Sequence, residues 1–410
     1  MRARAIGLLI SVLSSCADEP RRIDVELRDG EDVTVIPIDD LAHGDRIVFR
    51  LPSNIVGFSI ASFAHEGTVG AYYIVSPSGI RWVDDYRVGK NPELLLSDLL
   101  VSVAAVPQTD VFGTMDVEPG DWHVRFGGSI DRAELWIRRT EDGRFRGGTV
   151  DVDAYVAPNI LDNQESYVRS VLEATFPWVG LTLGDVRYLS LPAEYTVLDA
   201  SEFEAALTAT SGERMPMLNV LFVAMLNNLD GTVRGKAARL PGYSGSRTLA
   251  SGVAVALEGT LEEDVYILRH EMGHFMGLFH TTDYPTGVVD PLLDTPQCDE
   301  TLIETAHHEC PDAGNLMSPW MILDGLTESQ ERVIRGSSAY RGLSSAKSMT
   351  ASISFSSPIS PTIVPTEVRK VTFSMEERPM ISCSGVRVET PSNGVSCRSG
   401  SFRVCLALAR

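Results

Sequence analysis

The segment His270–His280, with the sequence HEMGHFMGLFH, constrains the fold of this chain more than any other stretch. It closes a longer run, LEEDVYILRHEMGHFMGLF, in which apolar residues recur every three or four positions, as on one side of an α-helix. That apolar side consists of Val265, Leu268, Met272, Phe275, Met276 and Phe279. His270 and His274 lie four positions apart, roughly opposite to it. The sequence therefore predicts a helix whose apolar side packs on a sheet while two imidazoles project into a cleft.

The same segment carries the residue types of a metal site. Two histidines four positions apart on a helix can bind one Zn²⁺, and Glu271 is placed to act as general base without binding the metal. Gly277 tolerates a positive φ, so the chain can leave the helix there and return His280 as a third ligand. Three protein ligands leave one position for water, which distinguishes a catalytic zinc site from a structural one. The alternative is a core helix with unrelated histidines, but three of only 8 histidines stand at these spacings.

The spacing HExxHxxGxxH resembles that of the metzincin metallopeptidases. A second motif, GNLMSP, places Met317 after the third histidine, as the Met-turn of a metzincin does. Between the two motifs, DTP precedes Cys298 and Cys310, an order that is similar to the pappalysin group. The resemblance covers roughly residues 150–340, and Pro319 stands where pappalysins usually carry an aromatic residue.

This resemblance implies a zinc-dependent endopeptidase that hydrolyses peptide bonds of protein or peptide substrates. His270, His274 and His280 would ligate one catalytic Zn²⁺ above an apolar floor formed by Met317. Glu271 would take a proton from the attacking water and then protonate the leaving amine.

A strand expected just before the helix is a candidate for substrate binding. The run SGVAVAL lies where a metzincin has the edge strand along which an extended peptide can add. Its residues Gly252, Val253, Ala254 and Val255 are the expected contacts. An ordinary strand inside the sheet is an equally good interpretation of this run.

A second class of function stays open beside the peptidase. The chain can be an envelope lipoprotein whose β-sandwich binds a ligand beside a catalytically idle peptidase-like domain. Glu271 argues against idleness, because a protein that only binds has no need of a general base. A purely structural zinc is disfavoured because a fourth ligand at suitable spacing is missing from the sequence.

The N-terminus predicts export and a lipid anchor. Arg2 and Arg4 precede a short apolar run, which is typical of a signal peptide and too short to cross a bilayer. LSSC resembles the bacterial lipobox, so residues 1–16 would be a signal peptide that ends at a lipidated Cys16. By resemblance to enterobacterial sorting rules, Ala17 favours the outer membrane or cell surface. The alternative is an ordinary signal peptide with an unrelated cysteine.

Cysteines and charge limit the remaining possibilities. In an oxidising compartment Cys298 and Cys310 are the natural disulfide pair, because they lie close together and flank one loop. Cys383, Cys397 and Cys405 have no assigned partners, and no cysteine between Cys16 and Cys298 is present to block the zinc. The net charge of −20 excludes nucleic acid as a partner. Three aspartates are possible Ca²⁺ ligands, although capping and turn roles suit them as well: Asp283, Asp290 and Asp294.

Patterning along the chain divides it into regions. Short alternating runs predict an all-β sandwich over 23–145, which most simply serves as a spacer or folding support. Strands that alternate with helices predict a catalytic domain with a mixed α/β sheet over 146–340, and the motif resemblance implies that this domain is metzincin-like. A serine-rich linker and a small cysteine-containing tail would occupy 341–410.

Overall fold

The computed structural model describes residues 19–27, 31–84, 100–210, 216–228, 231–245, 247–283, 288–319 and 323–342. The chain divides into two compact units, Met1–Ser345 and Ala346–Arg410, and every described residue belongs to the first. The predicted signal peptide, Cys16 and the three tail cysteines lie outside the described residues. Among those that are described, no helix is long and apolar enough to span a membrane.

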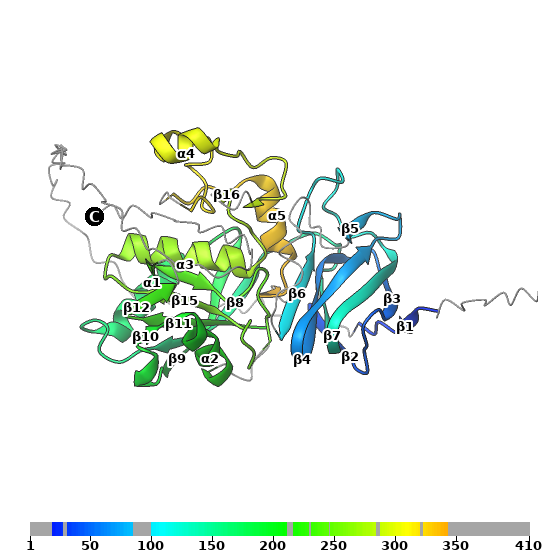
Figure 1. The fold of residues 1–410 in the computed structure, drawn as a ribbon, viewed down its shortest axis with the longest axis horizontal. Coiled ribbons are helices and arrows are strands. Elements are labelled where there is room, and N and C mark those ends of the chain that lie inside the picture. The colour runs from blue at the N-terminus through cyan, green and yellow to red at the C-terminus, as the bar shows by residue number, and fades with distance from the viewer. Residues whose placement is uncertain are drawn as a thin grey trace, which may run out of the picture. The chain divides into compact units, whose positions relative to one another are not determined.

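The N-terminal part of the described chain is all β (Figure 1). Its strands form one seven-stranded sheet in which β4 and β7 pair with each other along most of their lengths. β3 and β2 pair with successive parts of β7, and β6 and β5 with successive parts of β4. The strands are β1 (Arg21–Ile23), β2 (Val33–Ile38), β3 (Arg46–Leu51), β4 (Ile55–Val75), β5 (Arg81–Asp84), β6 (Val101–Val106) and β7 (Gly120–Arg139).

Alternation along these strands separates two apolar clusters. Ile60, Leu135 and Ala104 belong to the cluster that this sheet encloses, together with Trp122 and Phe49. Their neighbours in sequence face the other way and pack against Tyr243 and Ala250 from a later part of the chain; these neighbours are Ala61, Phe63, Val101, Val103 and Trp136. Because successive side chains of a strand point to opposite faces, β4, β6 and β7 are apolar on both sides.

A mixed sheet follows, so the described fold is mixed α/β. Its strands lie in the order β14-β15-β11-β8-β18, and β9 also pairs with β8. β9, β8, β11 and β15 are parallel neighbours, whereas β14 runs antiparallel to β15. The bounds are β8 (Gly148–Val156), β9 (Leu181–Ser190), β11 (Leu218–Val223), β14 (Gly235–Ala237), β15 (Val253–Ala256) and β18 (Arg341–Gly342).

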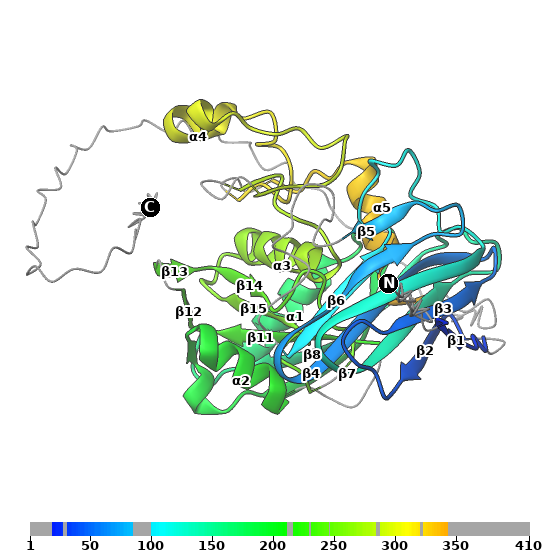
Figure 2. The same cartoon turned by 45° about the vertical axis from the view of Figure 1, so that its right-hand side comes forward.

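Helices cover both faces of this sheet (Figure 2). Val220 and Phe222 of β11 pack with α1 (Gln164–Thr175) and α3 (Leu261–Phe275), while Leu221 and Val223 pack with α2 (Ala200–Thr210). Burial on both faces explains why β11, with the sequence LNVLFV, is apolar at every position but Asn219 instead of alternating.

Short elements complete the described chain. They comprise η2 (Ala193–Tyr195), β10 (Val197–Leu198), β12 (Met225–Asn228), β13 (Gly231–Val233), β16 (Thr282–Asp283), β17 (Val288–Val289), α4 (Glu300–Ala306), η3 (His307–Glu309) and α5 (Glu328–Gly336). Thr327 and Gln330 form a capping box that fixes the start of α5.

The expectation that Gly252–Val255 is a sheet edge is wrong. β15 is paired on both sides, with β11 and with β14, and Val253, Ala254 and Val255 are completely buried. Within the described sheet β14 is the strand at this edge.

The burial of β11 makes a stability prediction. Leu221→Ala should lower the free energy of unfolding by about 2–5 kcal/mol, because it opens a cavity where Leu221 is completely buried. Met225→Ala on the neighbouring β12 is the control, since Met225 is 42% exposed, and should cost roughly 1 kcal/mol or less. Urea denaturation followed by circular dichroism measures both, and equal losses would contradict this packing.

Candidate metal centre

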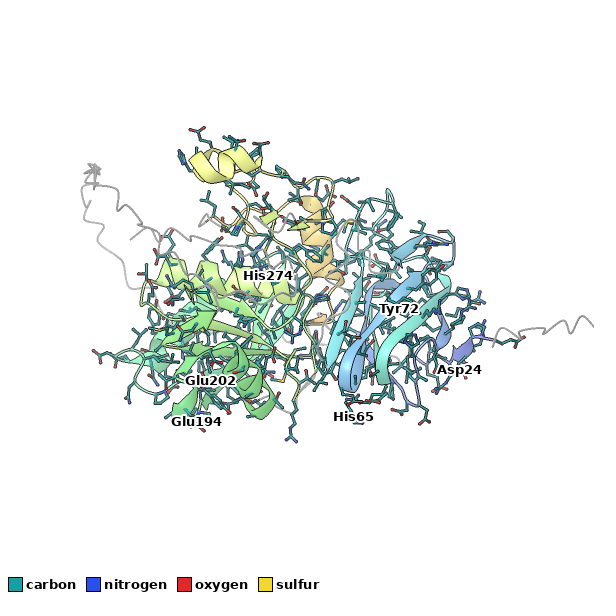
Figure 3. All side chains as sticks on the ribbon, viewed as in Figure 1. Asp24, His65, Tyr72, Glu194, Glu202 and His274 are labelled. Atoms are coloured by element: carbon teal, nitrogen blue, oxygen red, sulfur yellow. A yellow bond between two sulfur atoms is a disulfide. The ribbon has the colours of Figure 1, made fainter. Side chains whose placement is uncertain are left out.

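Helix α3 presents the predicted metal-binding residues. Leu268 and Met272 enter the core between the helix and the sheet, as the apolar periodicity predicts. His270, Glu271 and His274 lie on the side that lines an open cleft of about 460 Å³. His274 is labelled on this helix in Figure 3.

A turn at Gly277 returns the third histidine to the helix. α3 ends at Phe275, and Gly277 has φ of 111°. The amide of Gly277 donates to His274 O, and that of Leu278 donates to Gly273 O, which closes the C-terminus of the helix. A residue with a Cβ would be strained at this φ, so the glycine is what lets His280 approach His270 and His274.

The three imidazoles meet through their Nε2 atoms. The separations are 3.1 Å between His274 and His270, 3.0 Å between His274 and His280, and 3.2 Å between His270 and His280. Among the described residues, this group contains no fourth protein ligand. Sequence spacing therefore predicted a set of three nitrogens that the structure brings together.

Backbone carbonyls orient two of the rings. His270 Nδ1 donates to Leu316 O at 2.7 Å, and His274 Nδ1 donates to Leu278 O at 2.7 Å. A neutral imidazole with its hydrogen on Nδ1 has only a lone pair on Nε2. The lone pairs of these two rings therefore face one another, which is the arrangement that a shared cation stabilises.

The donor set fits zinc. Tetrahedral Zn²⁺ with Zn–N bonds of about 2.0–2.1 Å needs its nitrogens about 3.3 Å apart. The observed separations of 3.0–3.2 Å are close to that value. Three imidazoles and no fourth ligand in the described chain match the ligand count of a catalytic zinc.

Burial keeps these imidazoles neutral, as metal ligands must be. Desolvation lowers the pKa of His270, and desolvation together with the neighbouring His280 and His270 lowers the pKa of His274 well below its ordinary value. Desolvation, with a contribution from His270, lowers the pKa of His280 to about 3. At neutral pH all three rings can donate a lone pair without first losing a proton.

Glu271 lies between α3 and the edge strand β14. Its carboxylate is close to Gly235, where any Cβ would collide with Oε1, and it accepts a hydrogen bond from the backbone of Ala237. Burial raises the pKa of Glu271 to about 8, although Ala237 and Lys236 act in the opposite direction. The position beside the three imidazoles matches the predicted role of a proton carrier.

Met317 lies directly beneath the metal-binding helix. It is completely buried, and its Sδ contacts Gly273, where a Cβ would lie 2.6 Å from the sulfur. Asn315 Oδ1 accepts from Met317 N at 2.8 Å, and Asn315 Nδ2 donates to Gln330 Oε1 at 2.8 Å. Gln330 Nε2 in turn donates to Asp290 Oδ2 at 3.2 Å.

The predicted disulfide between Cys298 and Cys310 is present. Residues next to it bind the chain that follows the third histidine: Cys298 N donates to Thr282 Oγ1 at 2.9 Å, and Thr281 Oγ1 donates to Asp312 Oδ2. The loop that the disulfide closes therefore holds the segment after His280.

The possible calcium ligands are not gathered into one group among the described residues. Asp290 accepts from Leu292 N and Gln330, and Asp294 accepts from Ser329 N. The side chain of Asp283 lies outside the described residues. The turn and capping roles account for both described aspartates, and calcium stays a prediction.

Several contributors to the site could not be found from sequence motifs. Leu278 and Leu316 act through their backbone carbonyls, so the identity of their side chains gives no sequence signal for this role. The spacing of Thr327 and Gln330 indicates a helix start, but the contact of Gln330 with Asn315 joins different loops. The strand that contains Gly235 has only three residues, too few to give a strand signal in the sequence.

Comparisons with known proteins give partial structural likenesses. No protein-family model matches the sequence, and no curated protein matches it. The solved structures that resemble this chain include an archaemetzincin from Methanopyrus kandleri, with 20% identity, a TM-score of 0.27, 47% of this chain and 89% of that chain covered. Metalloproteinase-II from Bacteroides fragilis has 13% identity, a TM-score of 0.26, 40% of this chain and 59% of that chain covered.

A third likeness is to PliG of Salmonella Typhimurium, a periplasmic inhibitor of g-type lysozyme. It has 12% identity and a TM-score of 0.15, with 30% of this chain and 100% of that chain covered. All three TM-scores are low, so these likenesses assign no function to this chain.

The raised pKa of Glu271 predicts a pH dependence for the metal-free protein. Between an unfolded value of 4.5 and a folded value of about 8, the folded state holds a proton that the unfolded state has lost. Stability therefore falls as pH rises through this window. In Glu271→Gln that loss is absent, so the melting temperature of the variant minus that of the wild type should increase from pH 4.5 to about 8.

Differential scanning fluorimetry in chelator-treated buffers measures this difference. The other buried titratable groups are common to both proteins, and their effects cancel in the comparison. A constant difference across the window would show that Glu271 keeps an ordinary pKa.

Proposed function

We propose that this chain is a zinc-dependent endopeptidase with a metzincin-type centre, closest in its motifs to the pappalysin group. The observation that carries the proposal is the convergence of three Nε2 atoms within 3.2 Å of one another, beside a buried Glu271, at an open cleft. An idle domain would need neither the base nor the open side of the donor set.

His270, His274 and His280 would hold the metal, which when bound supplies a Lewis acid for the scissile carbonyl and for water. Glu271 takes the proton of the attacking water and later gives it to the leaving amine. Glu271 is only 6% exposed, so bulk water is largely excluded from this carboxyl.

The outer edge of β14, the end of this sheet among the described residues, is the proposed track for the substrate. Arg234 O and Ala238 N make the hydrogen bonds that join this edge to Ala256 N and Gly252 O. Gly235 and Ala237 lie at alternate positions, so their backbone groups point away from β15. An extended peptide that pairs there would pass Glu271, which contacts both residues.

The setting of the enzyme belongs to the same proposal. β8 to β18 with their helices would form the catalytic domain, and β1 to β7 an accessory domain. Lipidation of Cys16 would hold both at the outer membrane or cell surface, a proposal that rests on the sequence of residues 1–16.

Substitution of the general base tests the function. Glu271→Ala should reduce casein cleavage by about 10²–10⁴-fold, because it removes the carboxylate proposed to move the proton, while the zinc content stays at one per chain. Glu262→Ala is the matched control, since this glutamate is exposed on the same helix. Cleavage is followed with fluorescent casein, and metal is measured by mass spectrometry.

Equal activity of the wild type and Glu271→Ala would defeat the mechanism. Zinc-loaded wild type that cleaves neither casein nor a peptide library would favour the idle-domain alternative.

A further inference from the structure

The segment Gln108–Asp110 of the N-terminal β region reaches the loops that build the metal centre. It follows β6, and all three of its side chains hydrogen-bond residues that are more than a hundred and fifty positions further along the chain. Gln108 is 4% exposed and Thr109 is completely buried, so water does not replace these hydrogen bonds.

Gln108 and Thr109 contact the chain on both sides of the third histidine. Gln108 Nε2 donates to the carbonyl of Gly277, the residue whose positive φ returns His280 to the helix, at 3.4 Å. Thr109 Oγ1 donates to Pro291 O at 2.7 Å. Pro291 follows Asp290, which accepts from Gln330.

Asp110 joins the same set of loops at two points. Its Oδ1 accepts from Leu293 N at 2.8 Å, and its Oδ2 accepts from Ser329 Oγ at 2.8 Å. Ser329 immediately precedes Gln330 in the first turn of α5. Asp110 therefore fixes both the 290–294 loop and the start of the helix that carries Gln330.

Gln330 connects these contacts to the ring of His270. The side-chain amides of Gln330 and Asn315 each donate a hydrogen bond to the other, and Asn315 Oδ1 also accepts one from the backbone N–H of Met317. Between them lies Leu316, whose carbonyl accepts from His270 Nδ1. Each step in this series is a short contact between buried or half-buried groups, and a shift of the loops would move the carbonyl that orients His270.

We propose that Gln108, Thr109 and Asp110 are positioning residues for the metal centre. On this view the N-terminal β region is a working part of the site and not a spacer, because it sets the Gly277 turn and the Met317 turn from one segment. This inference rests on the proposed zinc site, but not on cleavage of any substrate. Metal binding and the contact between the two regions should therefore stabilise each other.

Zinc affinity of the full-length protein tests the proposal. Thr109→Val keeps the size of the side chain and removes its donor, and Asp110→Ala removes both acceptors. Each should bind zinc more weakly, by up to about 10-fold, the lower end of the range for losing a direct partner of a metal ligand, because both residues act through others. Competition with a fluorescent chelator gives the affinity, and the visible spectrum of the cobalt-loaded protein reports ligand geometry.

Two further variants separate positioning from folding. Thr109→Ser keeps the hydroxyl and should restore wild-type affinity and the cobalt spectrum. Ser59→Ala removes another buried hydrogen bond between the two regions, the one to Ser338, and should leave both measurements unchanged. Should Asp110→Ala fail to fold, the Thr109 pair decides the outcome.

Unchanged zinc affinity and cobalt spectra in Thr109→Val and Asp110→Ala, with only a lower melting temperature, would overturn the proposal. A wild type that binds zinc but cleaves nothing would defeat the proposed function alone, since the affinities of the variants would still decide this inference.

Discussion

The hydrogen bonds from His270 Nδ1 to Leu316 O and from His274 Nδ1 to Leu278 O fix the direction of two Nε2 lone pairs. Those lone pairs face each other across 3.1 Å, a separation at which two acceptors repel unless a cation lies between them. Protonation of one ring does not readily relieve this repulsion, because burial lowers the pKa of both rings. The turn at Gly277 and the turn at Met317 supply the two carbonyls, so the geometry of both turns decides whether the site can hold a metal.

The centre of this site was predictable because its signals are local. Helical periodicity from Val265 to Phe275 separates the apolar side of α3 from His270 and His274, and tertiary packing preserves that separation. A glycine just after the last helical residue is typical of a helix that ends with a positive φ, and φ of Gly277 is 111°. The Cys298–Cys310 pair was predictable for a similar reason, since it closes a short loop.

The identity of the edge strand was not predictable from the same kind of signal. VAVA in β15 is apolar because it is buried between two strands, but such a run does not reveal which neighbour completes the sheet. The actual edge, β14, has only three residues, Gly235 to Ala237, too few to show a strand pattern. Only the structure explains why position 235 is glycine: a Cβ there would collide with the side chain of Glu271.

The contacts of Gln108–Asp110 were equally out of reach, because they join chain segments that are remote in sequence. An alternating strand pattern predicts that an all-β region exists, but gives no signal for what a loop at its end will contact. Gln108 and Thr109 are buried and Asp110 is half-buried where they meet partners on the loops around the three histidines. These contacts are the basis for proposing that the N-terminal region is a part of the site and not only a support.

Zinc K-edge X-ray absorption of the purified protein tests the central claim most directly, because it counts the ligands of the metal. The structure predicts three imidazole nitrogens at about 2.0–2.1 Å and one further light atom from solvent. A sulfur neighbour at about 2.3 Å, or fewer than three imidazoles, would contradict a zinc held by His270, His274 and His280.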